Sequence, residues 1–184
     1  NKNKKKLNLI RLGTSGSLQK NIKIDTFIAA SYALGFDGLA HFYKSQDKLE
    51  KEMAVSYTNH ANWPSKLAYP YFIKASAYLL DQFSDIRKGI TATAPGFYVP
   101  QGRTLRVAPS INNLHQDMTS FKYKNNIITN LEMETSALYY LGQTLGHNTL
   151  TICAIIGNRI NKKYSNDYKK TVDRMIDLVL TRIC

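Results

Sequence analysis

The run TLTICAII at residues 149–156 is apolar at nearly every position. A strand with one face in water alternates apolar and polar side chains, so this run predicts a strand that is buried on both faces. Burial on both faces requires a layer of structure above and below the sheet, and in α/β proteins helices form those layers. The segment therefore indicates an α/β fold.

Strand-like and helix-like segments alternate along the rest of the chain. Strands are expected at residues 7–12, 24–34 and 89–94, a short strand feeding a helix at 71–83, and a strand or hairpin at 119–129 with Asn125 and Asn126 at its turn. Helices are expected at 44–61, at 134–146 with Gly146 closing it, and after a capping Asp167, where Val172, Met175, Ile176, Val179, Leu180 and Ile183 recur at helical spacing. This order predicts one α/β domain over residues 1–184, a three-layer sandwich with a mixed central sheet flanked by helices.

Composition narrows the class of protein. The longest apolar run, LTICAII at 150–156, is much shorter than the roughly 20 residues that a membrane-spanning helix needs, so no membrane partner is expected. The two cysteines, Cys153 and Cys184, fit a reducing cytosol better than a disulfide scaffold, which predicts a cytoplasmic protein. The chain begins without methionine and close to a strand-like segment, so we expect a longer protein and an N-terminally incomplete fold.

The formal net charge of +12 raises the question of nucleic acid as a partner. The lysines are scattered, however, and the one dense cluster comprises Lys2, Lys4, Lys5 and Lys6. Neither an aromatic–basic RNA signature nor helix-turn-helix spacing is present. A solvated lysine-rich surface, without a nucleic-acid partner, is the simpler interpretation. The positive field would still attract an anionic small-molecule substrate.

Two glycine-containing stretches have the residue types of binding loops. In RLGTSG (11–16), an arginine at a strand end precedes a Gly-Thr-Ser-Gly turn, which suits an oxyanion because backbone N–H groups, hydroxyls and a guanidinium converge. In TAPGFYVPQGR (93–103), Phe97 and Tyr98 offer flat faces, while Gln101 and Arg103 offer donors and an acceptor to a planar heterocycle. An ordinary strand-turn and a structural loop with polar tips are the alternatives.

Two further stretches place polar groups beside buried elements. In NLEMETSAL (130–138), Glu132 and Glu134 flank Met133 where a helix begins, so one of the acids, Glu132 in particular, can cap the helix, whereas Glu134 can instead accept two sugar hydroxyls. A metal site would need more carboxylate or histidine ligands, and the four histidines have no ligand spacing, so no metal is expected. In IIGNR (155–159), Asn158 and Arg159 follow the buried strand, where α/β sheets bind ligands; a polar loop start is the alternative.

Four stretches, taken together and in this order, resemble the uridine phosphorylase branch of the nucleoside phosphorylase family. They are RLGTSG, ITATAPGFYVPQGR, NLEMETSALYYLG and LTICAIIGNR. The family cleaves a nucleoside with phosphate and releases the free base and ribose 1-phosphate. The resemblance therefore implies a pentosyltransferase that uses inorganic phosphate as co-substrate, without another cofactor. It also implies a homo-oligomer, either a dimer or a hexamer.

The resemblance also implies roles for individual residues. Arg11 and Thr14 would bind phosphate, with Ser15 and Gly16 shaping the turn. Met133 would pack on the ribose and Glu134 would accept its hydroxyls. The base would meet Phe97, Gln101, Arg103, Ile156 and Arg159. Arg11, Glu134 and Arg103 would carry the catalysis, because they meet the phosphate, the cationic sugar and the departing base.

Two departures bear on specificity and on activity. Purine-directed relatives carry an acidic residue after the buried strand, whereas this chain has Asn158 there, which favours a pyrimidine nucleoside and uridine in particular. Gly157 replaces a larger apolar residue, which leaves the pocket size open. The family's further phosphate-binding residues, expected in an N-terminal portion, are absent from this chain, so the chain alone would hold half an active site. Either the sequence covers only part of the protein, or the chain is a fragment that we expect to be inactive. The alternatives are a purine nucleoside phosphorylase, a nucleosidase that uses water, and a non-catalytic nucleoside- or nucleic-acid-binding module.

Overall fold

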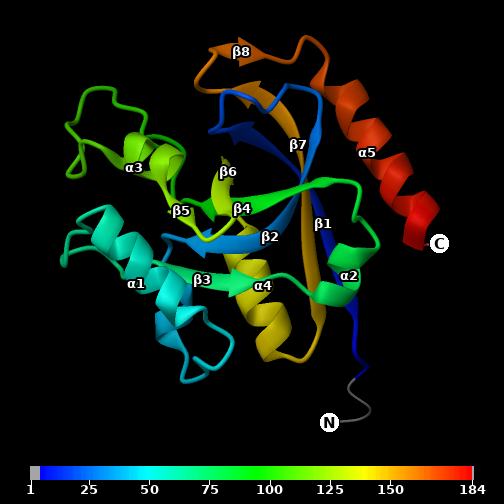
Figure 1. Cartoon of the computed structure of the whole chain (residues 1–184), viewed down its shortest axis with the longest axis horizontal. Helices are drawn as coiled ribbons and strands as arrows, with labels where there is room; N and C mark the ends of the chain where they lie inside the picture. The colour runs from blue at the N-terminus through cyan, green and yellow to red at the C-terminus, as the bar shows by residue number, and fades with distance from the viewer. Residues whose placement is uncertain (1–4, 184) are drawn as a thin grey trace.

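A mixed, strongly curved sheet organises the computed structural model, which describes residues 5–183 (Figure 1). The strand order is β3-β2-β4-β6-β1-β7-β8, and β5 pairs with β6. The strands are β1 (Asn8–Ser17), β2 (Phe27–Gly35), β3 (Tyr71–Lys74), β4 (Arg87–Thr93), β5 (Lys122–Tyr123), β6 (Asn126–Glu132), β7 (Asn148–Asn158) and β8 (Lys163–Tyr164). The pairs β1–β7, β2–β4 and β4–β6 are parallel, and the others are antiparallel, so the expected mixed α/β sheet is confirmed.

An additional pairing curls the sheet. Residues Phe27 to Ala29 of β2 pair with Ile152 to Ala154 of β7, so β2, β4, β6, β1 and β7 form a closed ring. Strand β7 is buried along nearly all its length, which confirms the interpretation of TLTICAII as a strand covered on both faces. Cys153 is fully buried there as a small apolar residue, and burial raises the pKa of its thiol to about 12.

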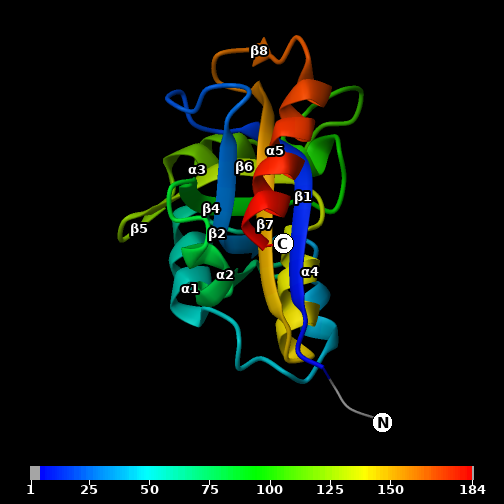
Figure 2. The same cartoon turned by 90° about the vertical axis from the view of Figure 1, so that its right-hand side faces the viewer.

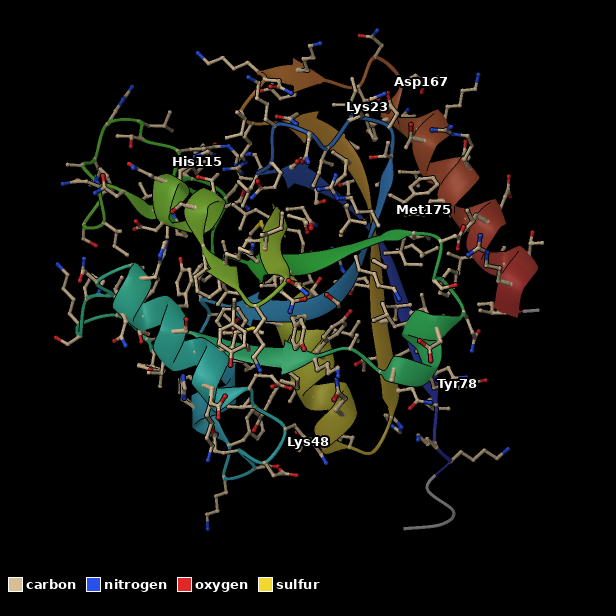
Figure 3. The ribbon with its side chains drawn as sticks, in the orientation of Figure 1. Lys23, Lys48, Tyr78, His115, Asp167 and Met175 are labelled. Carbon is tan, nitrogen blue, oxygen red and sulfur yellow. The ribbon has the colours of Figure 1, made fainter. Side chains whose placement is uncertain are left out.

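Helices cover both faces of the sheet, as expected, and Figure 2 shows α5 lying along β7 and β1. They are α1 (Lys51–His60), α2 (Ala77–Asp81), α3 (Leu114–Ser120), α4 (Thr135–Thr144) and α5 (Tyr168–Ile183), with 3-10 turns η1 (Leu39–Phe42) and η2 (Val99–Gln101). One core joins α2, α4 and α5 to β2 and β7, and it includes Met175, labelled in Figure 3. A second core joins α1 and α3 to β4 and β6.

The terminal helix follows its sequence pattern. Asp167 accepts a hydrogen bond from the Lys170 N–H at 3.2 Å, which confirms the expected cap. Met175 and Val179 are buried, whereas Ile176, Leu180 and Ile183 stay more than a third exposed, so the apolar stripe is wider than the buried face. Gly146 has a φ of 86° after α4, the left-handed geometry expected of a closing glycine.

Three local expectations need correction. The GTSG segment is not a turn, because β1 continues to Ser17 with an irregularity of register between Ser15 and Gly16. The helix expected at 44–61 occupies only Lys51–His60. Residues 114–120 form helix α3, and the β5–β6 turn is Lys124–Asn125, one residue earlier than expected, with Lys124 at a φ of 53°. Cys184, Lys2 and Lys4 lie outside the described residues.

Strand β1 is paired unequally along its two edges. It pairs with β7 from Asn8 to Ser17, but with β6 only at Gly16 and Ser17. Within residues 5–183, no strand pairs with the second edge of residues 8–15. Strands β1 and β6 run antiparallel and pair only near their carboxyl ends. The last residues of both strands, and the residues that follow them, therefore lie close together.

Candidate functional site

A cavity of about 930 Å³ lies where the carboxyl ends of β1, β6 and β7 meet the loop after β4. Its lining contains every site residue predicted from the sequence: Arg11, Thr14, Ser15, Gly16, Phe97, Gln101, Arg103, Met133, Glu134, Ile156 and Arg159. These residues come from four segments that are far apart in the chain. The fold therefore brings the predicted set together, although the role of each residue stays a prediction.

Arg11 lies between the two glutamates of NLEMETSAL. Its Nη2 atom donates a short hydrogen bond to Oε2 of Glu134, and its Nη1 atom lies 3.2 Å from Oε2 of Glu132. Nη1 is buried but forms no hydrogen bond of acceptable geometry within the described part of the chain. Buried donors nearly always have a partner, so this guanidinium is suited to an added anionic acceptor.

The two glutamates have different tasks. The Glu132 side chain is almost fully buried, and its carboxylate accepts the Thr93 hydroxyl at 2.7 Å and the backbone N–H groups of Glu134 and Thr135 at 2.9–3.1 Å. It therefore caps α4, as one sequence alternative proposed. The Glu134 side chain is 59% exposed and reaches into the cavity, where Arg11 is its charged partner.

The segment RLGTSG uses its glycines differently from the expected anion-binding turn. The backbone of residues 11–15 pairs with β7 in a regular ladder, so its N–H groups do not converge on one point. A Cβ on Gly13 would lie 2.3 Å from Nη1 of Arg11, and one on Gly16 would lie 3.3 Å from Nε of Arg159. Both glycines therefore provide room for arginine side chains that cross the strand.

Thr14 and Ser15 are not equally available in this part of the cavity. Thr14 is half-buried. Ser15 is only 5% exposed, and its hydroxyl accepts a hydrogen bond from the Asn130 amide at 3.0 Å. Asn130 in turn accepts hydrogen bonds from the hydroxyls of Thr91 and Thr129. Ser15 thus belongs to a buried polar network that fixes the end of β1, and Thr14 is the more accessible hydroxyl.

Gln101 organises the opposite end of the cavity. Its Oε1 atom accepts hydrogen bonds from Nη1 of Arg103 at 2.5 Å and Nη2 of Arg159 at 2.6 Å. Guanidinium groups only donate, so the carbonyl oxygen must face them, and the amide N–H groups face away. Arg103 also lies over the Phe97 ring, 4.0 Å from its centroid, and donates to the Phe97 carbonyl at 2.6 Å. Burial and the nearby Arg103 lower the pKa of Arg159 to about 10, so it is still charged at neutral pH.

Several lining residues were not singled out from the sequence. His115, labelled in Figure 3, lies in the first turn of α3 beside Gly102. Burial and the Arg159 charge lower the pKa of His115. Tyr164 on β8 lies over Gly157, where an added Cβ would be 3.2 Å from the ring. The ring therefore occupies space that a larger residue at position 157 would need. Lys162 completes the mouth.

Asn158 lines the cavity, as the sequence suggested, but its side-chain polar atoms form hydrogen bonds within the fold. Its amide donates to the carbonyls of Gln19 and Ile22, and its oxygen accepts from the N–H groups of Ile160 and Asn161. The residue is 2% exposed and holds the start of the β7–β8 turn against the loop before β2. Sequence position alone could not distinguish this structural role from a role in binding.

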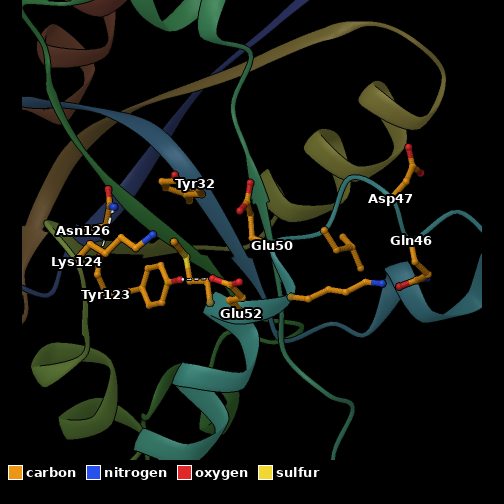
Figure 4. Close-up of a pocket in the computed structure, with 11 residues that line it drawn as sticks. Tyr32, Gln46, Asp47, Glu50, Glu52, Tyr123, Lys124 and Asn126 are labelled. Carbon is orange, nitrogen blue, oxygen red and sulfur yellow. Dashed lines mark hydrogen bonds between the residues drawn. The ribbon is translucent and has the colours of Figure 1, made fainter.

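A second surface pocket, of about 520 Å³, lies between β2, the start of α1 and the β5–β6 hairpin (Figure 4). None of the predicted site residues lines it. Its groups pair with one another: the Tyr123 hydroxyl donates to Glu52 at 3.1 Å, and the Lys124 ammonium lies 5.3 Å from the centre of the Tyr123 ring. The 930 Å³ cavity is therefore the candidate site.

Among residues 5–183, no group of three or more His, Cys, Asp or Glu side chains is arranged to hold a metal ion. No helix in that range is both long enough and apolar enough to cross a membrane.

The sequence matches the model of the phosphorylase superfamily over residues 6–182. The chain belongs to the phosphorylase superfamily. Two curated relatives are named uridine phosphorylase, which agrees with the resemblance drawn from the motifs. The one from Thermococcus kodakarensis is 28% identical over 169 residues, covering 88% of this chain and 52% of the relative. The one from Haemophilus influenzae is 22% identical over 174 residues, covering 94% of this chain and 63% of the relative.

Solved structures of phosphorylases have the same fold. A Trypanosoma brucei nucleoside phosphorylase, whose description reports uridine phosphorylase activity, aligns with a TM-score of 0.82 at 24% identity, covering 94% of this chain and 62% of that chain. An apo uridine phosphorylase from Schistosoma mansoni aligns with a TM-score of 0.61 at 22% identity, covering 95% and 59%. The chain thus spans between about half and two thirds of the length of these relatives.

Proposed function

We propose that the cavity is the substrate site of a nucleoside phosphorylase that cleaves uridine with inorganic phosphate. The observation that carries the proposal is the meeting of Arg11, Glu134 and the Gln101–Arg103–Arg159 cluster in one cavity. It offers a cation for an oxyanion, a carboxylate for hydroxyls and a donor-rich wall for a heterocycle. The names of the two curated relatives support the pyrimidine preference.

The anion would bind at Arg11. A phosphate oxygen would supply the acceptor that Nη1 lacks, and the Thr14 hydroxyl would add a donor. Arg11 also donates a hydrogen bond to Glu134, so a bound phosphate would compete with Glu134 for the guanidinium. Weakening of that hydrogen bond would leave the Glu134 carboxylate available to other donors. That carboxylate would then accept the ribose hydroxyls, with Met133 packing against the sugar.

Cleavage of the glycosidic bond would pass through an oxocarbenium-like sugar, as in glycoside hydrolysis. The phosphate and Glu134 would place negative charge beside that cation. Negative charge would gather on the departing pyrimidine, where the amide N–H groups of Gln101 and the guanidinium of Arg103 would stabilise it. Arg159 would hold the Gln101 oxygen away from the base and so keep the donors directed toward it.

The first test measures release of free base from uridine, inosine and methylthioadenosine, each with and without phosphate. We expect phosphate-dependent cleavage of uridine. Cleavage without phosphate would indicate a nucleosidase, and cleavage of the purine nucleosides alone would reverse the assigned specificity. Binding of uracil and phosphate is measured in parallel by calorimetry, because this chain spans only part of its relatives. Association into a dimer or hexamer stays a prediction, to be measured by sedimentation.

A matched pair of variants tests the base end. Arg103→Ala removes a guanidinium that lines the cavity, and Arg106→Ala removes an exposed one from the same loop. Loss of one charge-assisted contact, worth about 1.5–3 kcal/mol, should weaken uracil binding roughly tenfold to a hundredfold in Arg103→Ala. Arg106→Ala should bind like the wild type. Equal weakening in both variants would point to a general effect of loop charge.

A further inference from the structure

A small apolar cavity of about 170 Å³ lies behind the loop that carries Gln101 and Arg103. Its lining comprises Phe36, Trp63, Leu67, Ala68, Pro95, Val99, Pro100, Ser110, Ile111 and Leu114. Ser110 is the one residue of this lining that has a hydroxyl group, and no charged side chain lines the cavity. The cavity is separate from the candidate site and has no role in the proposed reaction.

The chemistry of the lining suits an aromatic ring better than water. Phe36 and Trp63 stack with their ring centres 5.1 Å apart and their planes 9° apart, which forms one flat wall. The Trp63 N–H is already used, since it donates to the Ala68 carbonyl at 3.1 Å. The cavity opens to solvent on one side, where Leu67, Ala68, Pro95 and Ser110 are exposed. Water inside it would find few of the two to four polar partners that an ordered water needs, whereas one aromatic ring matches its volume and its flat wall.

The loop after β4 forms the partition between this cavity and the candidate site. Within residues 94–103, three residues line the apolar cavity (Pro95, Val99, Pro100) and four line the site (Phe97, Gln101, Gly102, Arg103). At the start of α3, Leu114 and His115 divide in the same way. Pro100 and Gln101 are adjacent in the 3-10 turn η2, which is closed by the hydrogen bonds from Gln101 N–H to Tyr98 and from Gly102 N–H to Val99. A group pressing on Pro100 is therefore one residue from the centre of the base-binding cluster.

We propose that this cavity is an auxiliary binding site for a neutral one-ring aromatic ligand, and that its occupancy holds the 94–103 loop in place. The ligand would fill space against Trp63 and Pro100 and would disfavour movements of the loop that collapse or open the cavity. Binding to the closed loop stabilises it by mass action. Neither part of the proposal depends on the reaction assigned to the candidate site.

Toluene is the probe, and Trp63 is the reporter. The chain has one tryptophan, so its fluorescence reports on this cavity alone. Toluene should change the Trp63 emission saturably with one site per chain. Ile111→Phe fills the cavity and should abolish the response, whereas Leu105→Phe adds the same ring at a 70% exposed position of the same loop and should preserve it. An absent or non-saturable change, or an equal response in Ile111→Phe, would overturn the proposed site.

Trypsin cleavage after Arg103 and Arg106 measures the loop itself, with the cut sites identified by mass spectrometry. Saturating toluene should slow cleavage at these two positions several-fold in the wild type and leave cleavage elsewhere unchanged. Equal rates with and without toluene would overturn the claim that occupancy holds the loop. A Trp63 emission that changes with protein concentration in the absence of toluene would contradict the proposal, because a second copy of the chain would then fill the cavity.

Discussion

Replacing Glu132 by Gln should destabilise the protein far more than replacing Glu134 by Gln, although the two residues are separated only by Met133. The Glu132 carboxylate accepts the Thr93 hydroxyl and the first two N–H groups around the start of α4, and it lies beside Arg11. Gln has the same shape but one acceptor oxygen, and its NH₂ group faces donors. With the NH₂ group in place of Oε2, the Glu134 N–H loses its acceptor, and the Arg11 guanidinium keeps Glu134 as its charged partner.

The magnitude follows from these contacts. A helix cap contributes about 1 kcal/mol, and a hydrogen bond to a charged group contributes about 1.5–3 kcal/mol. Glu132→Gln should therefore lower the free energy of unfolding by about 3 kcal/mol, or lower Tm by about 6–12 °C for a domain of this size. The exposed Glu134 has one charged partner, Arg11, and its loss should cost less than about 1 kcal/mol.

Urea unfolding followed by far-ultraviolet circular dichroism measures both variants, with the slope of each transition checked against the wild type. Turnover of uridine should fall strongly in Glu134→Gln, while its urea midpoint stays near that of the wild type. If Glu132→Gln stays within about 1 kcal/mol of the wild type, or if Glu134→Gln is equally unstable, the division of labour between the two acids is wrong.

Three further outcomes are expected. Gly13→Ala should weaken phosphate binding roughly tenfold in calorimetry, because its Cβ would lie 2.3 Å from Nη1 of Arg11 and the guanidinium must move. Gly157→Val should displace the Tyr164 ring and raise the uracil dissociation constant several-fold, and combining it with Tyr164→Ala should add little further. Burial and the Arg159 charge lower the pKa of His115 in the folded protein, whereas the unfolded chain takes up this proton at about pH 6.5. As the pH falls below that value, the wild type should therefore lose more stability than His115→Gln. The measurement is the urea midpoint, which should drop more in the wild type between about pH 7.5 and about pH 5.5.

The parts of the fold that could be predicted from sequence are those set by local pattern. The unbroken apolar run of β7 and the helical spacing of Val172, Met175 and Val179 reflect burial that each segment carries in its own residues. The closing contact between β2 and β7 could not be predicted, because pairing between distant strands leaves no periodic signal in either one. The prediction of a turn at GTSG was wrong for a similar reason, because its glycines make room for the side chains of Arg11 and Arg159 and do not form a turn.

The membership of the site came from the family resemblance and its motifs, and all eleven residues line one cavity. His115 and Tyr164 were missed because both stand outside any recognisable motif, and Tyr164 reaches the cavity only through the pairing of β8 with β7. The structural hydrogen bonds of Asn158, which lines the cavity, could not be predicted, because a polar residue after a buried strand has the same sequence signature whether it binds a ligand or caps a turn.

The unequal pairing of β1 has a consequence for how the chain behaves at high concentration. A strand edge that no other strand covers is a template for pairing with another molecule, and within residues 5–183 no strand pairs with the second edge of residues 8–15. Lys5 and Lys6 are exposed where that edge begins, and repulsion between like charges should keep two such edges apart in dilute salt. Because mobile ions shorten the range of that repulsion, added salt should promote self-association of this protein. A protein kept in solution by uncharged polar groups would lack this response to salt.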